Sequence, residues 1–266
     1  MSKLTPANPD AVMVIRDVCE SITTISLPFS RYGYVPIGGR ATIVKLKTGS
    51  LAVFSPVAYT PSVETKLNEL GNRVRYLIAP DVEHHLFIKA WKDLYPQAEV
   101  IGPHGLQEKW QYHPATKNEK VDYVFTPENK REMKIQPEFD EEFDYEYVNA
   151  HQNRELVFCH KPSRTLIEAD LMFNLPAVEQ YSKSPEDPAG SGAARLMNKA
   201  GCAASNCNNW QRRFLWYAGI RDHKSGKESI ARISEWDFQR LIPCHGDVIE
   251  VAAKNVFLDV FKWFLP

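Results

Sequence analysis

The feature that most restricts the fold is an alternation of strand and helix signals in the first 101 residues. Four short apolar runs, each bounded by turn residues, predict strands over residues 41–47, 51–54, 74–79 and 98–101. Between the later strands, apolar residues at helical spacing predict helices over residues 63–70 and 84–94. A strand–helix–strand order implies parallel strands in one sheet, because the crossover helix packs on the sheet face.

The rest of the chain has a different pattern. Short alternating segments predict antiparallel strands over residues 123–126, 133–135, 143–148, 156–160 and 165–167. The C-terminal part predicts helices over residues 210–218, 227–236 and 251–264, and a strand over residues 240–243. This mixed order is typical of a two-sheet αββα sandwich, a four-layer α/β fold. The pattern alone is also compatible with other α/β folds.

The length of the chain, 266 residues, suits one large domain or two small ones. We expect a single domain over residues 1–266. A polar stretch at about residues 182–209 is rich in Ser, Pro, Gly, Ala and Asn, and it predicts a loop-rich insertion. Loops of that length tend to be functional or mobile.

Charge and hydropathy restrict the classes of partner. The net charge is −1, so nothing predicts attraction to nucleic acid or to a membrane surface. No apolar run approaches the roughly 18 residues that cross a bilayer, and the N-terminus lacks the pattern of a signal peptide. We therefore expect a cytoplasmic protein that binds a small molecule and neither nucleic acid nor membrane.

The five cysteines are odd in number and scattered along the chain. This pattern predicts free thiols in a reducing compartment, not a disulfide framework. Cys202 and Cys207 are near enough in sequence to pair or to bind a metal, but we interpret them as plain loop cysteines.

Residues with metal-binding chemistry follow the predicted strand 74–79, in the order Asp81-Val82-Glu83-His84-His85. Strand ends are where α/β sheets bind ligands, and imidazoles beside carboxylates suit Zn²⁺ or Fe²⁺. A plainer interpretation is a helix start, with Asp81 as the N-cap and Glu83 near the positive end of the helix dipole. That interpretation explains the two acids better than the two histidines.

Three further polar residues, His151, Asp170 and His245, follow predicted strands later in the chain. Each is weak evidence alone, because an acid at a strand end is often only a turn former. Their order and spacing favour one shared pocket over three unrelated polar residues.

The order of these features resembles the metallo-β-lactamase superfamily over roughly residues 23–264. Asp170-Leu171-Met172-Phe173 is similar to the Asp-x-Leu-Phe segment of that superfamily, and Pro243-Cys244-His245-Gly246-Asp247 to its terminal His-Gly segment. More specific runs resemble a family described as domain of unknown function 4336. These runs are Ser55-Pro56-Val57, Ala79-Pro80-Asp81, His84-His85-Leu86-Phe87, His160-Lys161-Pro162-Ser163-Arg164-Thr165-Leu166 and Trp236-Asp237-Phe238. The resemblance implies the αββα fold more firmly than any reaction.

The chain departs from the superfamily at its first motif, His-x-His-x-Asp-His. This motif aligns either with residues 79–84, which makes His84 the last ligand, or with residues 80–85, which makes His85 the last ligand. Both registers lose at least the first two histidines, and both stay open. The Asp that the superfamily carries after its hairpin is replaced by Ser55-Pro56.

The resemblance implies one metal ion per chain, zinc or, as the alternative, iron. The implied ligands come from both halves of the chain: His84 or His85, His151, Asp170 and His245. Asp81 and Glu83 are the catalytic candidates, because an acid in the first motif of the superfamily commonly orients the metal-bound water.

Three functions are compatible with this pocket. The first is hydrolysis of a small ester, lactone, amide or thioester by a metal-bound hydroxide. The second, which the altered first motif favours, is a catalytically inactive binding or scaffold protein with the same fold. The third is an iron protein with a redox role, and this chain has no room for the flavin domain that it would need.

Overall fold

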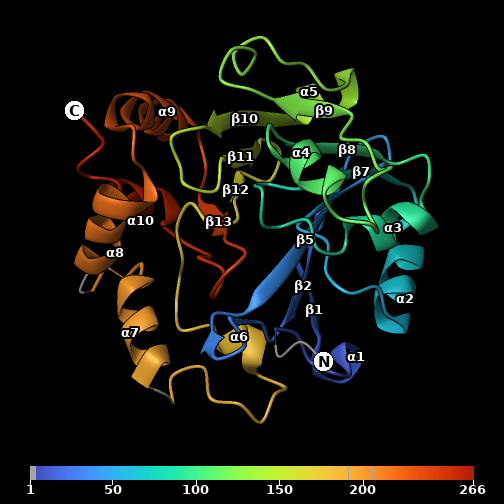
Figure 1. Ribbon diagram of the computed structural model, residues 1–266, viewed down its shortest axis with the longest axis horizontal. Coiled ribbons are helices and arrows are strands. Elements are labelled where there is room, and N and C mark those ends of the chain that lie inside the picture. The colour runs from blue at the N-terminus through green and yellow to red at the C-terminus, as the bar shows by residue number, and fades with distance from the viewer. Residues whose placement is uncertain (1–3, 191, 205–206) are drawn as a thin grey trace.

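Two β-sheets packed face to face form the centre of the molecule (Figure 1). The computed structural model describes residues 4–190, 192–204 and 207–266. The larger sheet has the strand order β1-β2-β5-β6-β7-β8-β9, and the smaller has the order β10-β11-β12-β13. Strands β3 and β4 form a separate two-stranded ribbon.

The strands of the larger sheet are β1 (Val14–Cys19), β2 (Ile22–Leu27), β5 (Gly39–Lys45), β6 (Leu51–Phe54), β7 (Val74–Ile78), β8 (Glu99–Pro103) and β9 (Tyr123–Phe125). Those of the smaller sheet are β10 (Phe143–Val148), β11 (Glu155–His160), β12 (Thr165–Ile167) and β13 (Arg240–Ile242). The ribbon consists of β3 (Ser30–Arg31) and β4 (Val35–Pro36). Pairing in the larger sheet is antiparallel from β1 to β6 and parallel from β6 to β9.

The helices lie around the two sheets (Figure 1). Those of the first half are α1 (Pro9–Val12), α2 (Pro61–Leu70), α3 (Ile88–Leu94), α4 (Leu106–Gln111) and α5 (Pro137–Glu142). Those of the second half are α6 (Val178–Tyr181), α7 (Gly192–Ala200), α8 (Asn209–Phe214), a π-helical turn η1 (Leu215–Gly219), α9 (His223–Glu235) and α10 (Ala253–Val260).

Apolar side chains fill three layers between these elements. Between the sheets, Phe54 of the larger sheet contacts Phe158 of the smaller one. On the outer face of the larger sheet, Trp91 and Trp110 bring α3 and α4 into a second cluster. On the outer face of the smaller sheet, Phe257 of α10 belongs to a third cluster. The predicted four-layer αββα sandwich is therefore confirmed.

Local signals in the sequence explain why some elements match their predictions. Helix α2 begins where Thr60 caps it by accepting a hydrogen bond from the Val63 amide, at 3.4 Å. It ends at Gly71, which adopts φ 103°, a left-handed conformation that glycine tolerates best. Strand β7 has a nearly continuous buried pattern, as expected for a strand between two parallel neighbours.

Other predictions were wrong. Strand β9 pairs in parallel with β8 in the larger sheet and is not antiparallel. Residues 133–135 form irregular structure instead of a strand. Helix α3 begins at Ile88, not at residue 84, because residues 81–87 form turns that hold polar side chains. The strands β1 and β2 were not predicted.

Helix α7 lies within the polar stretch for which a loop-rich insertion was predicted. The interpretation of Cys202 and Cys207 as plain loop cysteines was wrong, since they form a disulfide. Among the described residues, the free thiols are Cys19, Cys159 and Cys244. In the part of the chain that the structure describes, no helix is both long enough and apolar enough to span a bilayer.

Candidate metal centre

One end of the sandwich collects polar side chains from the loops that follow four strands. Asp81 and His84 follow β7, and His151 lies in the turn between β10 and β11. Asp170 follows β12, and His245 follows β13. The first two loops are joined by a hydrogen bond from the Val82 amide to the Asn153 carbonyl, at 3.1 Å.

Asp81 fixes the turn that carries His84. Its side chain is fully buried, and its Oδ1 accepts hydrogen bonds from the main-chain amides of Glu83 and His84, each at 2.7 Å. The same oxygen lies 2.8 Å from Nδ1 of His84. Because Nδ1 donates to this carboxylate, Nε2 of His84 is left to face the cavity. Asp81 thus sets both the position and the tautomer of His84.

The imidazoles of His84 and His245 face each other through their Nε2 atoms, 3.1 Å apart. Nδ1 of His245 donates to the Gly38 carbonyl at 2.6 Å, so its Nε2 also carries a lone pair when the ring is neutral. Oδ1 of Asp170 lies 3.1 Å from this Nε2. Two lone pairs and a carboxylate therefore meet at one point, an arrangement that a shared proton or a cation stabilises.

The charges in this cluster shift its protonation equilibria. Burial lowers the pKa of His84, but Asp81, Cys244 and Asp170 together outweigh it and raise that pKa well above its ordinary value. Burial likewise opposes the charged form of Asp170, yet His84 and His245 hold the pKa of this carboxyl below its usual range. Asp170 is therefore ionised at neutral pH, and the site is built to place negative charge against a cation.

Two buried polar atoms at this point lack a hydrogen-bond partner among the described residues. They are Oδ2 of Asp81 and Nε2 of His151, whereas Oδ1 of Asp170 has the His245 ring beside it. A buried polar atom without a partner costs about 1–3 kcal/mol, so each such atom needs an explanation. His151 is held with Nδ1 3.4 Å from the Asn153 amide, and burial lowers its pKa, so it is neutral. The donor set fits a metal ion on this evidence.

Cys244 is a metal-binding candidate that the sequence analysis did not select. Its ligand atom lies with those of His84 and His245 in a group whose members are all within 4.8 Å of one another. Asp81, His84 and Asp170 form a second such group. Burial raises the pKa of the Cys244 thiol, but the two imidazoles outweigh it and lower that pKa to about 7. The sequence signal that could have identified Cys244 was its position directly before His245.

Two buried glutamates support the turn that carries Asp170. Glu155 accepts hydrogen bonds from the main-chain amides of Ala169 and Asp170, at 2.6 and 3.2 Å. Glu168 accepts one from the Met172 amide at 3.2 Å. Burial and the neighbouring carboxylates raise the pKa of both glutamates well above the ordinary value. The sequence analysis did not select either residue.

The two remaining candidates lie outside this cluster of donors. His85 turns toward α4, where its Nδ1 accepts a hydrogen bond from the Trp110 indole at 3.0 Å. Burial lowers the pKa of His85 to about 4, so the ring is neutral. Glu83 is exposed and pairs with Lys109 at 3.0 Å. The structure therefore favours the register in which residues 79–84 replace the first motif and His84 faces the centre.

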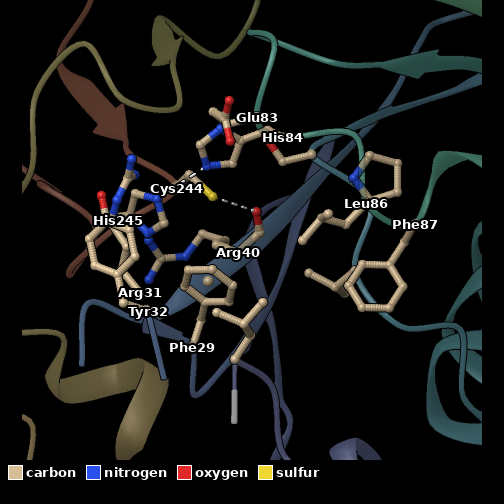
Figure 2. A pocket seen from close by; sticks show the side chains of 15 residues that line it. Phe29, Arg31, Tyr32, Arg40, Glu83, His84, Leu86, Phe87, Cys244 and His245 are labelled. Atoms are coloured by element: carbon tan, nitrogen blue, oxygen red, sulfur yellow. Dashed lines mark hydrogen bonds between the residues drawn. The ribbon is translucent and has the colours of Figure 1, made fainter. Parts of the chain in front are cut away.

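A cavity of about 280 Å³ opens beside these donors. Figure 2 shows His84, Cys244 and His245 on one side of it and Phe87 on the other, with Phe29 beside His245. Arg31 lines both this cavity and a second one, of about 330 Å³, that reaches Asp170. A small, partly apolar molecule fits beside the donor cluster.

The sequence between residues 30 and 225 matches the family described as domain of unknown function (DUF4336). The chain belongs to this family. A search among functionally described proteins gives no significant match to this DUF4336 chain.

Solved structures with the same fold share little sequence with the DUF4336 protein. It is similar to the DIM-1 metallo-β-lactamase, with 13% identity, a TM-score of 0.58, and coverage of 97% of this chain and 98% of the other. The metallo-β-lactamase from Pontibacter korlensis has 11% identity, a TM-score of 0.55 and coverages of 94% and 99%. The Flv1 flavodiiron core from Synechocystis has 12% identity, a TM-score of 0.63 and coverages of 95% and 60%. These likenesses place the DUF4336 protein in the metallo-β-lactamase fold.

Proposed function

We propose that this DUF4336 protein is a metal-dependent hydrolase that acts on a small ester, lactone, amide or thioester. One zinc ion, or an iron ion in its place, would be held by His84, Asp170 and His245. The observation that carries the proposal is the meeting of the Nε2 atoms of His84 and His245 and the Asp170 carboxylate through contacts of 3.1 Å. Nitrogen and carboxylate donors in this number leave an open coordination position.

The residues around that position have separable roles. A bound zinc ion would supply a hydroxide near neutral pH and polarise the oxygen of the scissile carbonyl. Asp81 holds His84 through one carboxylate oxygen and has its other oxygen free to accept a proton from an attacking water. His151 is neutral and its Nδ1 accepts from the Asn153 amide, so its unpartnered Nε2 carries the proton and can donate to a substrate oxygen.

The cavity supports a substrate with an apolar part. Phe29, Val57 and Phe87 line the cavity, and Phe29 stacks on the His245 ring, so apolar side chains reduce the contact of the donors with water and strengthen electrostatic interactions there. Its volume of about 280 Å³ restricts the bound group to a small molecule. The neutral overall charge supports a small-molecule partner without nucleic acid or membrane binding.

We also propose that the protein acts in the cytoplasm. Cys19, Cys159 and Cys244 are free thiols, which supports a reducing compartment. The disulfide between Cys202 and Cys207 is the observation against it. Fractionation of the native host, with the protein detected by antibody, tests this location.

A second candidate function is an inactive binding protein. The exposure of Glu83 and its pairing with Lys109 favour it, because this acid takes the place of the superfamily's water-orienting Asp in the register 79–84. The two candidate functions differ in one measurable property, because only the hydrolase turns over a substrate. If the metal-loaded protein does not hydrolyse a panel of small p-nitrophenyl esters, lactones and thioesters, the inactive binding protein is the better description.

Metal content tests the proposed centre directly. We expect about one metal ion per chain in protein purified without added metal, and Asp170→Ala and His245→Ala should each lower zinc affinity at least about tenfold. His113→Ala is the matched control, since His113 is exposed in a loop. Elemental analysis and zinc titration give the readout. A metal content of less than about 0.1 ion per chain, together with no zinc binding on titration, would contradict the proposal.

A further inference from the structure

The sulfur of Cys244 lies at the proposed centre without belonging to the ligand set named above. Its Sγ is grouped with the ring nitrogens of His84 and His245 within 4.8 Å, and the residue is 5% exposed. Figure 2 shows the sulfur beside the His84 ring, on the same wall of the cavity as His245. A nitrogen and a sulfur that bind one zinc ion lie at most about 4.3 Å apart, since zinc binds nitrogen at about 2.0 Å and sulfur at about 2.3 Å, and the 4.8 Å limit of this group places the sulfur close to that reach.

The thiol has two polar neighbours, the imidazole of His84 and a main-chain carbonyl. Its hydrogen bond is to the main-chain carbonyl of Arg40, at 3.4 Å, and a thiol is a weak donor. Two unpartnered polar atoms, Oδ2 of Asp81 and Nε2 of His151, are buried in the same centre and indicate that the centre is made for a ligand. The thiol is therefore free to exchange a weak contact for a metal bond.

The loop that carries Cys244 is held rigidly against the larger sheet. Nη1 of the buried Arg40 donates to the carbonyls of Pro243 and Gly246, at 2.7 and 2.6 Å. Gln180 donates to the Cys244 carbonyl at 2.7 Å and accepts from the Gly246 amide at 2.9 Å. Because both flanks of the loop are fixed, the sulfur is presented to the centre without a conformational cost on binding.

We propose that Cys244 is a thiolate ligand of the metal, joining the nitrogens of His84 and His245 and the carboxylate of Asp170; water or substrate would then take a fifth position, a coordination number that catalytic zinc can reach. This inference rests on the proposed metal centre and specifies the cation that the centre takes. A thiolate and two imidazoles select zinc and cobalt(II) over magnesium, calcium and manganese, because hard cations prefer oxygen ligands. On binding, the thiol loses its proton to solvent and the sulfur donates an electron pair to the metal.

Cobalt(II) reports a sulfur ligand by its spectrum. Metal-free protein titrated with cobalt(II) should develop an intense near-ultraviolet band from thiolate-to-metal charge transfer. Cys244→Ser should bind cobalt(II) without this band and lose at least about tenfold in zinc affinity. Cys159→Ser is the matched control, because Cys159 is also a buried free thiol but lies in β11, in the core of the smaller sheet. Cys159→Ser should keep both the near-ultraviolet cobalt(II) band and the zinc affinity of wild-type protein.

The outcomes separate this inference from the proposed function. Cobalt(II) that binds wild-type protein without the band, or a band that survives in Cys244→Ser, would overturn the sulfur ligand and leave the metal centre standing. No cobalt(II) or zinc binding by wild-type protein would overturn both. If Cys244→Ser does not fold, X-ray absorption spectroscopy of the zinc-loaded wild-type protein tests whether sulfur binds the metal. A sulfur shell at about 2.3 Å supports the inference, and nitrogen and oxygen alone contradict it.

Discussion

Two neighbouring histidines, His84 and His85, show how one hydrogen bond assigns a residue its role. Nδ1 of His84 is bound to the Asp81 carboxylate, which directs Nε2 into the cavity. Nδ1 of His85 instead accepts from Trp110, which turns this ring toward α4. The sequence could not choose between them, because adjacent side chains in a turn point in directions that depend on its backbone conformation. The same limit applies to Cys244, whose role depends on which way its side chain points.

This pair makes a matched test at the residue scale. His84→Ala should lower zinc affinity at least about tenfold, because it removes a donor from the centre. His85→Ala should leave zinc affinity unchanged and lower the free energy of unfolding by about 1–2 kcal/mol, because the Trp110 indole loses its buried acceptor. Zinc titration and urea unfolding measure the two effects. If His85→Ala reduces metal affinity as much as His84→Ala, the assignment of the register is wrong.

At the scale of elements, the sequence predicted segments whose pattern is local and missed those decided by their neighbours. Helix α2 has a cap, an apolar stripe and a stop, and it was predicted to within a few residues. Strand β2 is buried at every position and so lacks the alternation that marks a strand. The parallel pairing of β9 depends on its position beside β8, which no local pattern encodes. Asp170 and His245 were found because they follow strands that were themselves recognisable.

The turn after β12 is an element whose shape depends on one side chain of the adjacent strand. Glu155 accepts from two main-chain amides of that turn, and burial together with the neighbouring carboxylates raises its pKa well above the ordinary value. Glu155→Gln keeps an acceptor oxygen, so we expect unfolding free energy within about 1 kcal/mol of wild type. Glu155→Ala should cost about 2–4 kcal/mol and weaken zinc binding, because Asp170 loses its support. Chemical unfolding of both variants measures this, and equal losses would show that the charged carboxylate is required.

For the whole molecule, the candidate centre lies where the ends of the two sheets meet, and a single buried cation links them. Arg40 belongs to β5 of the larger sheet, yet its guanidinium binds the loop after β13 of the smaller sheet. Glu179 of α6 provides the counter-charge, at 3.4 Å. A buried arginine needs this number of acceptors, because an uncompensated buried charge is strongly destabilising. The same contacts that join the sheets therefore hold Cys244 and His245 in place.

Replacing Arg40 should show how much more the buried cation between the two sheets contributes to the free energy of unfolding than an exposed ion pair does. Arg40→Met retains much of the apolar volume but removes the donors to Pro243 and Gly246, so we expect a loss of about 3–5 kcal/mol in the free energy of unfolding. Zinc affinity should fall with it, since the loop carrying His245 is released. Arg232→Met is the control: Arg232 pairs with Glu146 at 3.2 Å with half of its side chain exposed, and its loss should cost no more than about 1 kcal/mol. Urea unfolding and zinc titration of the two variants decide the matter. Equal stability losses and unchanged affinity in Arg40→Met would mean that the two sheets hold the centre without this link.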